Sequence, residues 1–192
     1  MEPNPYRTRV VAEHAVNTTQ RKICHRYLQL YATSDTGDMS ITELCRAVPV
    51  ARTTFYHYFA SLDEVRHYIE DNWVGRALRL ADQLGRSTAG VSSKTFVEEQ
   101  VADFLASTRL TLKVLMLVHP SRTFLKKISD ALKARYWERC GGDEMRLEII
   151  SGGICALINN YLRLKQPVDH RRWVARCGKL TQQLLVTMSV NS

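Results

Sequence analysis

The sequence predicts an all-helical protein. Apolar residues recur at intervals of three and four along most of the chain, which is the spacing of one face of an α-helix. Glycine and proline interrupt this pattern at only a few places, and little of the chain alternates like a strand. We expect a small amino-terminal helical domain over residues 1–65 and a larger helical domain over residues 66–192.

The first predicted helix occupies residues 19–32. Its core side is marked by side chains at helical spacing, namely Ile23, Tyr27, Leu30 and Tyr31. A second helix begins after Ser40, because Ser40 and Glu43 form a capping box in which each side chain accepts from the other residue's backbone amide. Pro49 ends this helix, since proline disfavours helical geometry at the residue before it.

The next helix has two different faces. One face is aromatic and carries Phe55, Tyr58 and Phe59, while the other carries Arg52, Thr53, Tyr56 and His57. A second capping box, Ser61 with Glu64, then opens a longer helix. Two short helices joined by a tight turn in this way are a helix-turn-helix, whose second helix would fit the major groove of DNA.

The segment TFYHYF, from Thr54 to Phe59, resembles part of the amino-terminal domain of the TetR family of bacterial transcriptional regulators, as do the helix around Leu44 and Cys45 and the first helix. The resemblance covers about residues 18 to 72. It implies a three-helix DNA-binding domain, followed by a helical domain that binds an inducer and forms a dimer. Three positions differ from the family pattern, which usually has glycine, a serine or threonine cap, and often lysine where this chain has Pro49, Ala51 and Leu62.

We expect Arg52, Thr53 and His57 to face base edges, because they lie toward the outward amino-terminal part of the second helix. Tyr56 and Tyr58 resemble the phosphate-binding aromatic positions of the family, although Tyr58 would equally suit the core. Further hydroxyls that would reach phosphates belong to Ser40, Thr42, Thr54 and Ser61.

The helical pattern continues from Leu62 toward Leu84, and breaks at residues 85–93, 119–121, 141–143 and 165–167 divide the rest into segments of helical length. One segment has a heptad spacing through Leu147, Ile150, Ile154, Leu157 and Tyr161, and the last segment carries Trp173, Leu180 and Leu184 on one side. We expect these two helices to form a four-helix homodimer interface. The alternative is a hairpin that packs these residues on the core of its own chain.

Residues 95–140 correspond to the region that encloses the inducer pocket in the TetR family. The side chains that we expect there are Phe104, Arg109, Met116, His119, Tyr136 and Trp137. Arg109, His119 and Tyr136 would orient a ligand, since binding pockets are mostly apolar with a few polar groups. The alternative is that each is an ordinary core or surface residue. The basic helix over residues 122–139, which includes Arg135 and Arg139, is expected to be a solvated surface face, and the alternative is that it attracts an anionic ligand or a second stretch of nucleic acid.

The composition favours a cytoplasmic protein without a cofactor. There is no apolar run long enough to span a membrane and no apolar stretch typical of a signal peptide. The five cysteines lack the spacing of a zinc site, and the motifs of phosphate-binding and hydrolytic enzymes are missing, so we expect neither a metal nor an enzyme. The net charge is +8, but residues 1–75 hold eight basic and nine acidic side chains. The net charge therefore says little about DNA binding, which depends on the charge of the local face. The cations that could line this face are Arg21, Lys22, Arg26, Arg46 and Arg52.

The sequence thus predicts a homodimeric, ligand-responsive repressor that binds a palindromic DNA operator, with a small molecule tilting the long helix after Leu62. An alternative follows from Pro49, Ala51 and Leu62: a TetR-like regulator with weak or lost DNA binding that acts through a partner protein. The sequence specifies neither the effector, the operator, the target genes, nor the choice between repression and activation.

Overall fold

The computed structural model describes residues 4–6, 17–87, 94–165 and 168–189, and within these ranges the secondary structure is helical. The all-helical prediction is confirmed for these residues. In chain order the elements are α1 (Thr18–Thr33), α2 (Ile41–Ala47), α3 (Arg52–Tyr58), α4 (Leu62–Ser87), α5 (Lys94–Ser107), α6 (Arg109–Lys113), the π-helical turn η2 (Val114–Val118), α7 (Arg122–Tyr136), α8 (Glu144–Arg163) and α9 (His170–Ser189).

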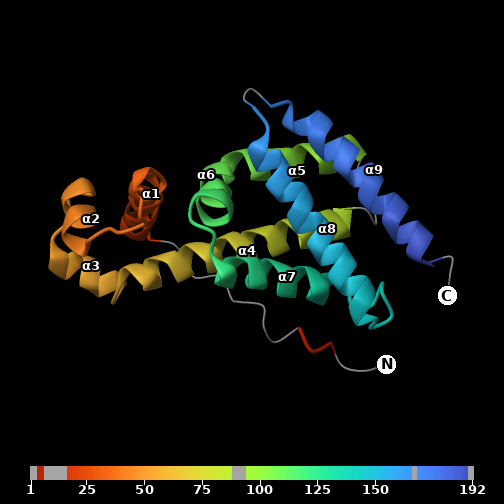
Figure 1. Ribbon diagram of the computed structural model, residues 1–192, viewed down its shortest axis with the longest axis horizontal. Helices are drawn as coiled ribbons and strands as arrows, with labels where there is room; N and C mark the ends of the chain where they lie inside the picture. The colour runs from red at the N-terminus through yellow and green to blue at the C-terminus, as the bar shows by residue number, and fades with distance from the viewer. Residues whose placement is uncertain (1–3, 7–16, 88–93, 166–167, 190–192) are drawn as a thin grey trace.

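The long helix α4 organises the molecule. The three helices α1, α2 and α3 gather around its amino-terminal end, and the remaining helices pack along the rest of it (Figure 1). A domain boundary at residue 65 falls inside α4, and one buried apolar cluster runs without interruption from Phe55 through Val65 and Trp73 to Tyr161. The helices α1, α2 and α3 are therefore joined to the remaining helices by the continuous helix α4 and by a shared apolar core.

Capping side chains set the helix starts. Ser40 Oγ accepts from the Glu43 amide at 3.1 Å and Glu43 Oε2 accepts from the Ser40 amide at 2.8 Å, as predicted. At α4 the prediction holds only in part, because Ser61 Oγ accepts from the Glu64 amide at 3.1 Å but Glu64 Oε2 accepts from the amide of Ala60. A capping box at Asn17, with Gln20, also begins α1 and was not predicted.

The turn between α2 and α3 has the form of a Schellman motif. The Val50 amide donates to the carbonyl oxygen of Cys45 at 3.2 Å, and Pro49 occupies the position with left-handed backbone, with φ of 28°. Glycine usually fills this position because it adopts positive φ at little cost. Proline favours φ near −65° and has no amide to donate to the helix, so Pro49 places strain in this turn.

Replacing Pro49 with glycine is therefore expected to raise the free energy of unfolding by about 1 kcal/mol, because relief of backbone strain outweighs the greater flexibility of the unfolded chain. Urea denaturation measures this change. The control is Pro120→Gly, because Pro120 lacks the left-handed backbone angle and its replacement should destabilise the protein through the unfolded chain alone. Equal destabilisation by both changes would contradict the strain at Pro49.

Candidate nucleic-acid interface

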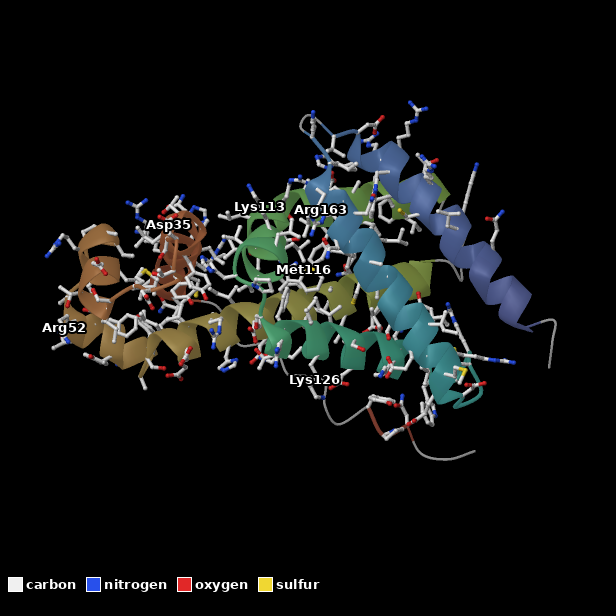
Figure 2. The ribbon with its side chains drawn as sticks, in the orientation of Figure 1. Asp35, Arg52, Lys113, Met116, Lys126 and Arg163 are labelled. Atoms are coloured by element: carbon white, nitrogen blue, oxygen red, sulfur yellow. The ribbon has the colours of Figure 1, made fainter. Side chains whose placement is uncertain are left out.

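Helix α3 has one buried and one exposed face. Phe55 and Phe59 are buried in the core at 0% and 2% exposure. Arg52, Thr53, Tyr56 and His57 are exposed on the other side, and Arg52 points away from the body at the outer end of the molecule (Figure 2). Because the aromatic core fixes the helix from behind, its polar face is held rigidly toward solvent.

Two of the exposed side chains are paired with each other. Arg52 Nη2 donates to the hydroxyl oxygen of Tyr56 at 3.4 Å. This hydrogen bond raises the pKa of the Arg52 guanidinium, so the group stays charged at any physiological pH. One turn of α3 therefore presents a permanent cation beside a phenol, a pair suited to a guanine edge or a phosphate.

The other residues predicted to contact DNA differ in how much they project. Thr54 is half-buried, and Tyr58 is half-buried with its ring packed on the core and 4.9 Å from the His57 ring. Thr42 and Ser61 are exposed. Ser40 is exposed but its hydroxyl donates to Glu43 Oε2 at 2.8 Å, which places a carboxylate where a phosphate contact was expected.

The side chains of Ala51 and Leu62 carry no hydrogen-bond donor for DNA. Ala51 is the N-cap of α3 and provides no side-chain hydrogen bond to the first amides. Leu62 packs on the core through a half-buried side chain. The structure thus has an uncapped helix start and an apolar side chain at two of the three positions that differ from the pattern that the sequence resembles.

The six predicted ligand-binding residues do not come together. Of these, only Tyr136 lines the apolar cavity, of about 400 Å³, that lies between α4, α5, α7 and α8. Phe104 packs against Trp73 at 5.4 Å between ring centres, Met116 is buried in the main core (Figure 2), and Trp137 belongs to a separate buried cluster.

Arg109 and His119 hold segments of the chain together. The Arg109 guanidinium donates to the carbonyl oxygens of Tyr161, Leu162 and Leu164 at 3.1 to 3.3 Å, and so caps the carboxyl end of α8. A ring nitrogen of His119 lies 3.0 Å from the carbonyl oxygen of Ser34, and its ring packs on Tyr31 at 4.3 Å. His119 therefore joins the end of η2 to the loop that follows α1.

The polar residues of the apolar cavity are Arg135 and Tyr136 at the end of α7, and Arg139 in the turn that follows it. Sequence reasoning assigned the two arginines to a solvated basic face. The signal for Arg135 is the spacing of the cavity-lining residues along α7, at Ile128, Ala131, Leu132, Arg135 and Tyr136, which is one helical stripe that changes from apolar to polar. Arg139 lies beyond the end of α7, so the helical stripe does not place it.

The residues predicted for the dimer interface lie mainly inside the chain. Leu147, Ile150 and Tyr161 are buried, while Ile154, Leu157 and Trp173 are half-buried. Leu180 is 44% exposed, and the side chain of Leu184 lies outside the described residues. Within this single chain, the heptad residues of α8 therefore pack mainly on the core of their own chain, which is the arrangement of the hairpin alternative.

Another stripe on α8 faces solvent. Met145 is 74% exposed and Ile149 is 48% exposed, and Gly152 and Ala156 continue their line at spacings of four, three and four. Such a spacing places the four residues on one side of the helix. Large apolar side chains followed by small ones form a surface on which a second helix can pack closely.

Within the described ranges, no cluster of three or more His, Cys, Asp or Glu side chains is arranged to hold a metal. The described helices also include none that is long and apolar enough to cross a membrane. Comparison with known proteins finds no matching family, and neither a curated protein nor a solved structure matches the chain significantly.

Proposed function

We propose that this chain is a helix-turn-helix transcriptional regulator that binds double-stranded DNA as a homodimer and responds to a small molecule. The observation that carries the proposal is the exposed face of α3, where Arg52, Thr53, Tyr56 and His57 project from a short helix fixed by Phe55 and Phe59. The resemblance of residues 18–72 to the TetR family supports the same function.

The dependence of DNA affinity on salt tests this proposal. A protein that contacts several phosphates releases counterions, so its affinity falls steeply as the salt concentration rises. We expect a slope of about −4 or steeper for the logarithm of affinity against that of salt, from a fluorescence anisotropy titration with duplex DNA. A slope near zero would favour the partner-protein alternative, which the uncapped Ala51 and the apolar Leu62 support.

The homodimer that we propose uses the exposed stripe of α8. Two copies related by a two-fold axis would place Ile149 of each chain near the small residues Gly152 and Ala156 of the other. Recognition helices of a dimer then contact two half-sites about one turn of DNA apart. Leu180 of α9, also exposed, would extend the contact.

Replacing Ile149 with glutamate is expected to weaken self-association at least about tenfold, because a charge would be buried without a partner at the centre of the interface. Sedimentation velocity over a range of protein concentrations measures the change. Val118→Glu is the matched control, since Val118 is an exposed apolar residue outside α8. An unchanged dimer in the Ile149 variant would rule out this stripe as the interface.

The apolar cavity is the site that we propose for the effector. Its wall includes Trp73, Val74, Ala77 and Leu78 of α4, the same helix that begins beside α3. A ligand that contacts these residues differently in two positions of α4 would change the separation of the two recognition helices. Coupling of this kind is typically about 1 to 3 kcal/mol.

A further inference from the structure

A second cleft, of about 700 Å³, lies between α1, α4 and the junction of α5 with α6. It is separate from the effector cavity, although Trp73 borders both. One wall is a face of α1, with the residues Thr18, Arg21, Lys22, Cys24, His25 and Leu28. The opposite wall is a face of α4, with the residues Tyr68, Ile69, Asn72, Trp73 and Arg76. Ser107 and Thr111 close the third side. The volume exceeds that of a single inorganic ion and suits a small organic molecule.

The cleft is positively charged. Arg21 and Lys22 enter it from α1 and Arg76 from α4, all three exposed, and no aspartate or glutamate is among its lining residues. Burial raises the pKa of the Cys24 thiol to about 12, so this group adds no negative charge at neutral pH. Cations that line one cleft without a carboxylate among the other lining residues concentrate anions there.

Two buried polar atoms on the α4 wall lack a hydrogen-bond partner among the described residues. One is the carbonyl oxygen Oδ1 of Asn72 and the other is the indole Nε1 of Trp73, whose side chain is buried. An unsatisfied buried polar group costs about 1 to 3 kcal/mol. Both residues line the cleft, so an unpartnered acceptor and an unpartnered donor in its lining residues indicate a ligand that supplies both a hydroxyl and an oxygen acceptor.

We propose that this cleft binds a phosphorylated small molecule that carries hydroxyl groups, of the sugar-phosphate or nucleotide class. The phosphate lies among Arg21, Lys22 and Arg76, since guanidinium groups bind phosphate oxygens through paired hydrogen bonds. The hydroxyl-bearing part lies against α4, where one hydroxyl donates to Asn72 Oδ1 and a ligand oxygen accepts from Trp73 Nε1.

The test follows the indole resonance of Trp73 by NMR, assigned with a Trp73→Phe variant, during titration of the full chain. The probes are glucose 6-phosphate and adenosine 5′-monophosphate, with glucose, adenosine and inorganic phosphate as controls. We expect a saturable shift with at least one phosphorylated probe below about 10 mM, and a weaker response to every control. Arg76→Ala should weaken the binding at least about tenfold through the loss of a charge-assisted hydrogen bond.

Arg122→Ala is the matched control, because Arg122 is exposed, carries the same charge and lies outside the cleft. It should change the affinity by less than about twofold. Equal weakening by both variants, or no saturable shift with either phosphorylated probe, would overturn the proposal. Inorganic phosphate that binds as tightly as the organic probes would overturn the assignment of an organic ligand.

Phosphates of DNA are the other source of this chemistry, because Arg21 and Lys22 were also expected to contact the DNA backbone. A duplex that shifts the Trp73 resonance, and loses affinity in Arg76→Ala while the small probes do not bind, would assign the cleft to DNA and overturn the proposal. The small-molecule titration contains no DNA. A negative result in that titration would therefore not contradict the proposed DNA-binding function. Likewise, a protein that does not bind DNA would not contradict the proposed small-molecule site.

Discussion

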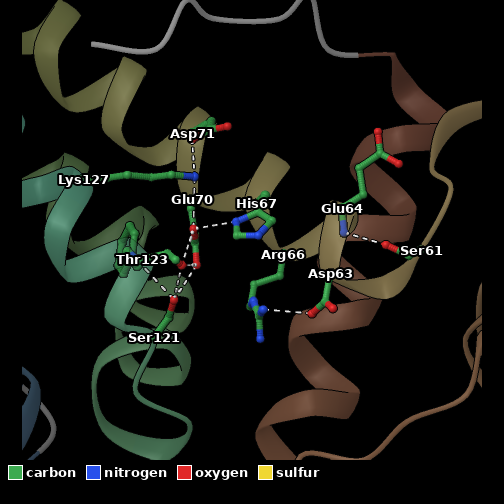
Figure 3. Close-up of polar contacts among 11 residues, drawn as sticks. Ser61, Asp63, Glu64, Arg66, His67, Glu70, Asp71, Ser121, Thr123 and Lys127 are labelled. Carbon is green, nitrogen blue, oxygen red and sulfur yellow. Dashed lines mark hydrogen bonds and ion pairs between the residues drawn. The ribbon is translucent and has the colours of Figure 1, made fainter. Parts of the chain in front are cut away.

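Replacing Glu70 with alanine is expected to lower the free energy of unfolding by about 3 to 5 kcal/mol, because it breaks a buried ion pair and removes the carboxylate that accepts from Ser121 and Thr123. The Glu70 carboxylate is fully buried in the contact between α4 and α7. It accepts from the hydroxyls of Ser121 at 2.5 Å and Thr123 at 3.0 Å, and lies 3.1 Å from Lys127 Nζ (Figure 3).

The same residues also position α7. Ser121 is the N-cap of α7 and its Oγ accepts from the amide of Phe124 while donating to Glu70. Lys127 bridges Glu70 and Asp71, and His67 contacts Glu70 at 3.2 Å from the exposed side. Loss of the carboxylate therefore removes the acceptor shared by the first turn of α7 and by Lys127.

Urea denaturation measures the change, and Asp82→Ala is the matched control. Asp82 also joins α4 to α7, through an ion pair with Arg135 at 2.9 Å, but it is exposed, so its removal should cost less than about 1 kcal/mol. If the alanine variant does not fold, Glu70→Gln replaces it in this measurement, because glutamine keeps the shape of the side chain and removes the charge. Equal effects of Glu70→Ala and Asp82→Ala would contradict the role of the buried network.

The pH dependence of stability provides a second measurement for Glu70. Burial by itself raises the pKa of this carboxyl, but hydrogen bonds from Ser121, Lys127 and His67 and the charge of Lys127 outweigh it, and the net pKa lies below the usual 4.5. A depressed pKa in the folded state contributes stability above the unfolded pKa, which is lost as the pH falls through the folded value. Wild type should therefore lose more stability than Glu70→Gln below about pH 4.5.

Replacing Arg52 with alanine is expected to cost about 1 to 3 kcal/mol in affinity for the preferred DNA site and less for unrelated DNA, so that specificity relaxes. The reason is the position of Arg52 at the exposed start of α3, where its guanidinium would bond a guanine through two donors. A Tyr56→Phe variant, which loses only the hydroxyl that Arg52 contacts, should weaken binding to all sequences alike.

Arg52→Lys is the matched control, since lysine keeps the charge but lacks the paired donors of arginine. It should retain affinity for unrelated DNA and still lose discrimination. Competition titrations with the preferred site and a scrambled duplex at one salt concentration measure both quantities. Wild-type specificity in the Arg52→Ala variant would show that another residue reads the bases.

Local signals in the sequence predicted the start of α2 and the buried face of α3. Ser40 with Glu43 and the aromatic spacing of Phe55 and Phe59 depend on residues within one or two turns, which a short segment specifies by itself. The Glu70 network was not predictable in this way, because Ser121 and Thr123 lie 51 and 53 residues away. Only the packing of α7 on α4 brings them together.

Packing also decided which stripe of α8 is buried. The heptad residues Leu147 and Ile150 and the stripe of Met145 and Ile149 share the same helix, and both have helical spacing. The position of α7 covers the first and leaves the second exposed, a difference that periodicity cannot supply. Arg109 is a similar case, since its three carbonyl partners belong to the distant end of α8.

The most direct test of DNA binding is a selection of genomic DNA fragments that the purified protein retains at physiological salt, followed by footprinting of the enriched fragments. We predict a protected palindrome whose half-sites are about one helical turn apart. No enrichment by a folded dimer would contradict DNA binding and favour the partner-protein alternative. Ala51→Ser and Leu62→Lys would then be the first changes to make, because they introduce a cap and a cation at two positions whose side chains carry no donor for a phosphate.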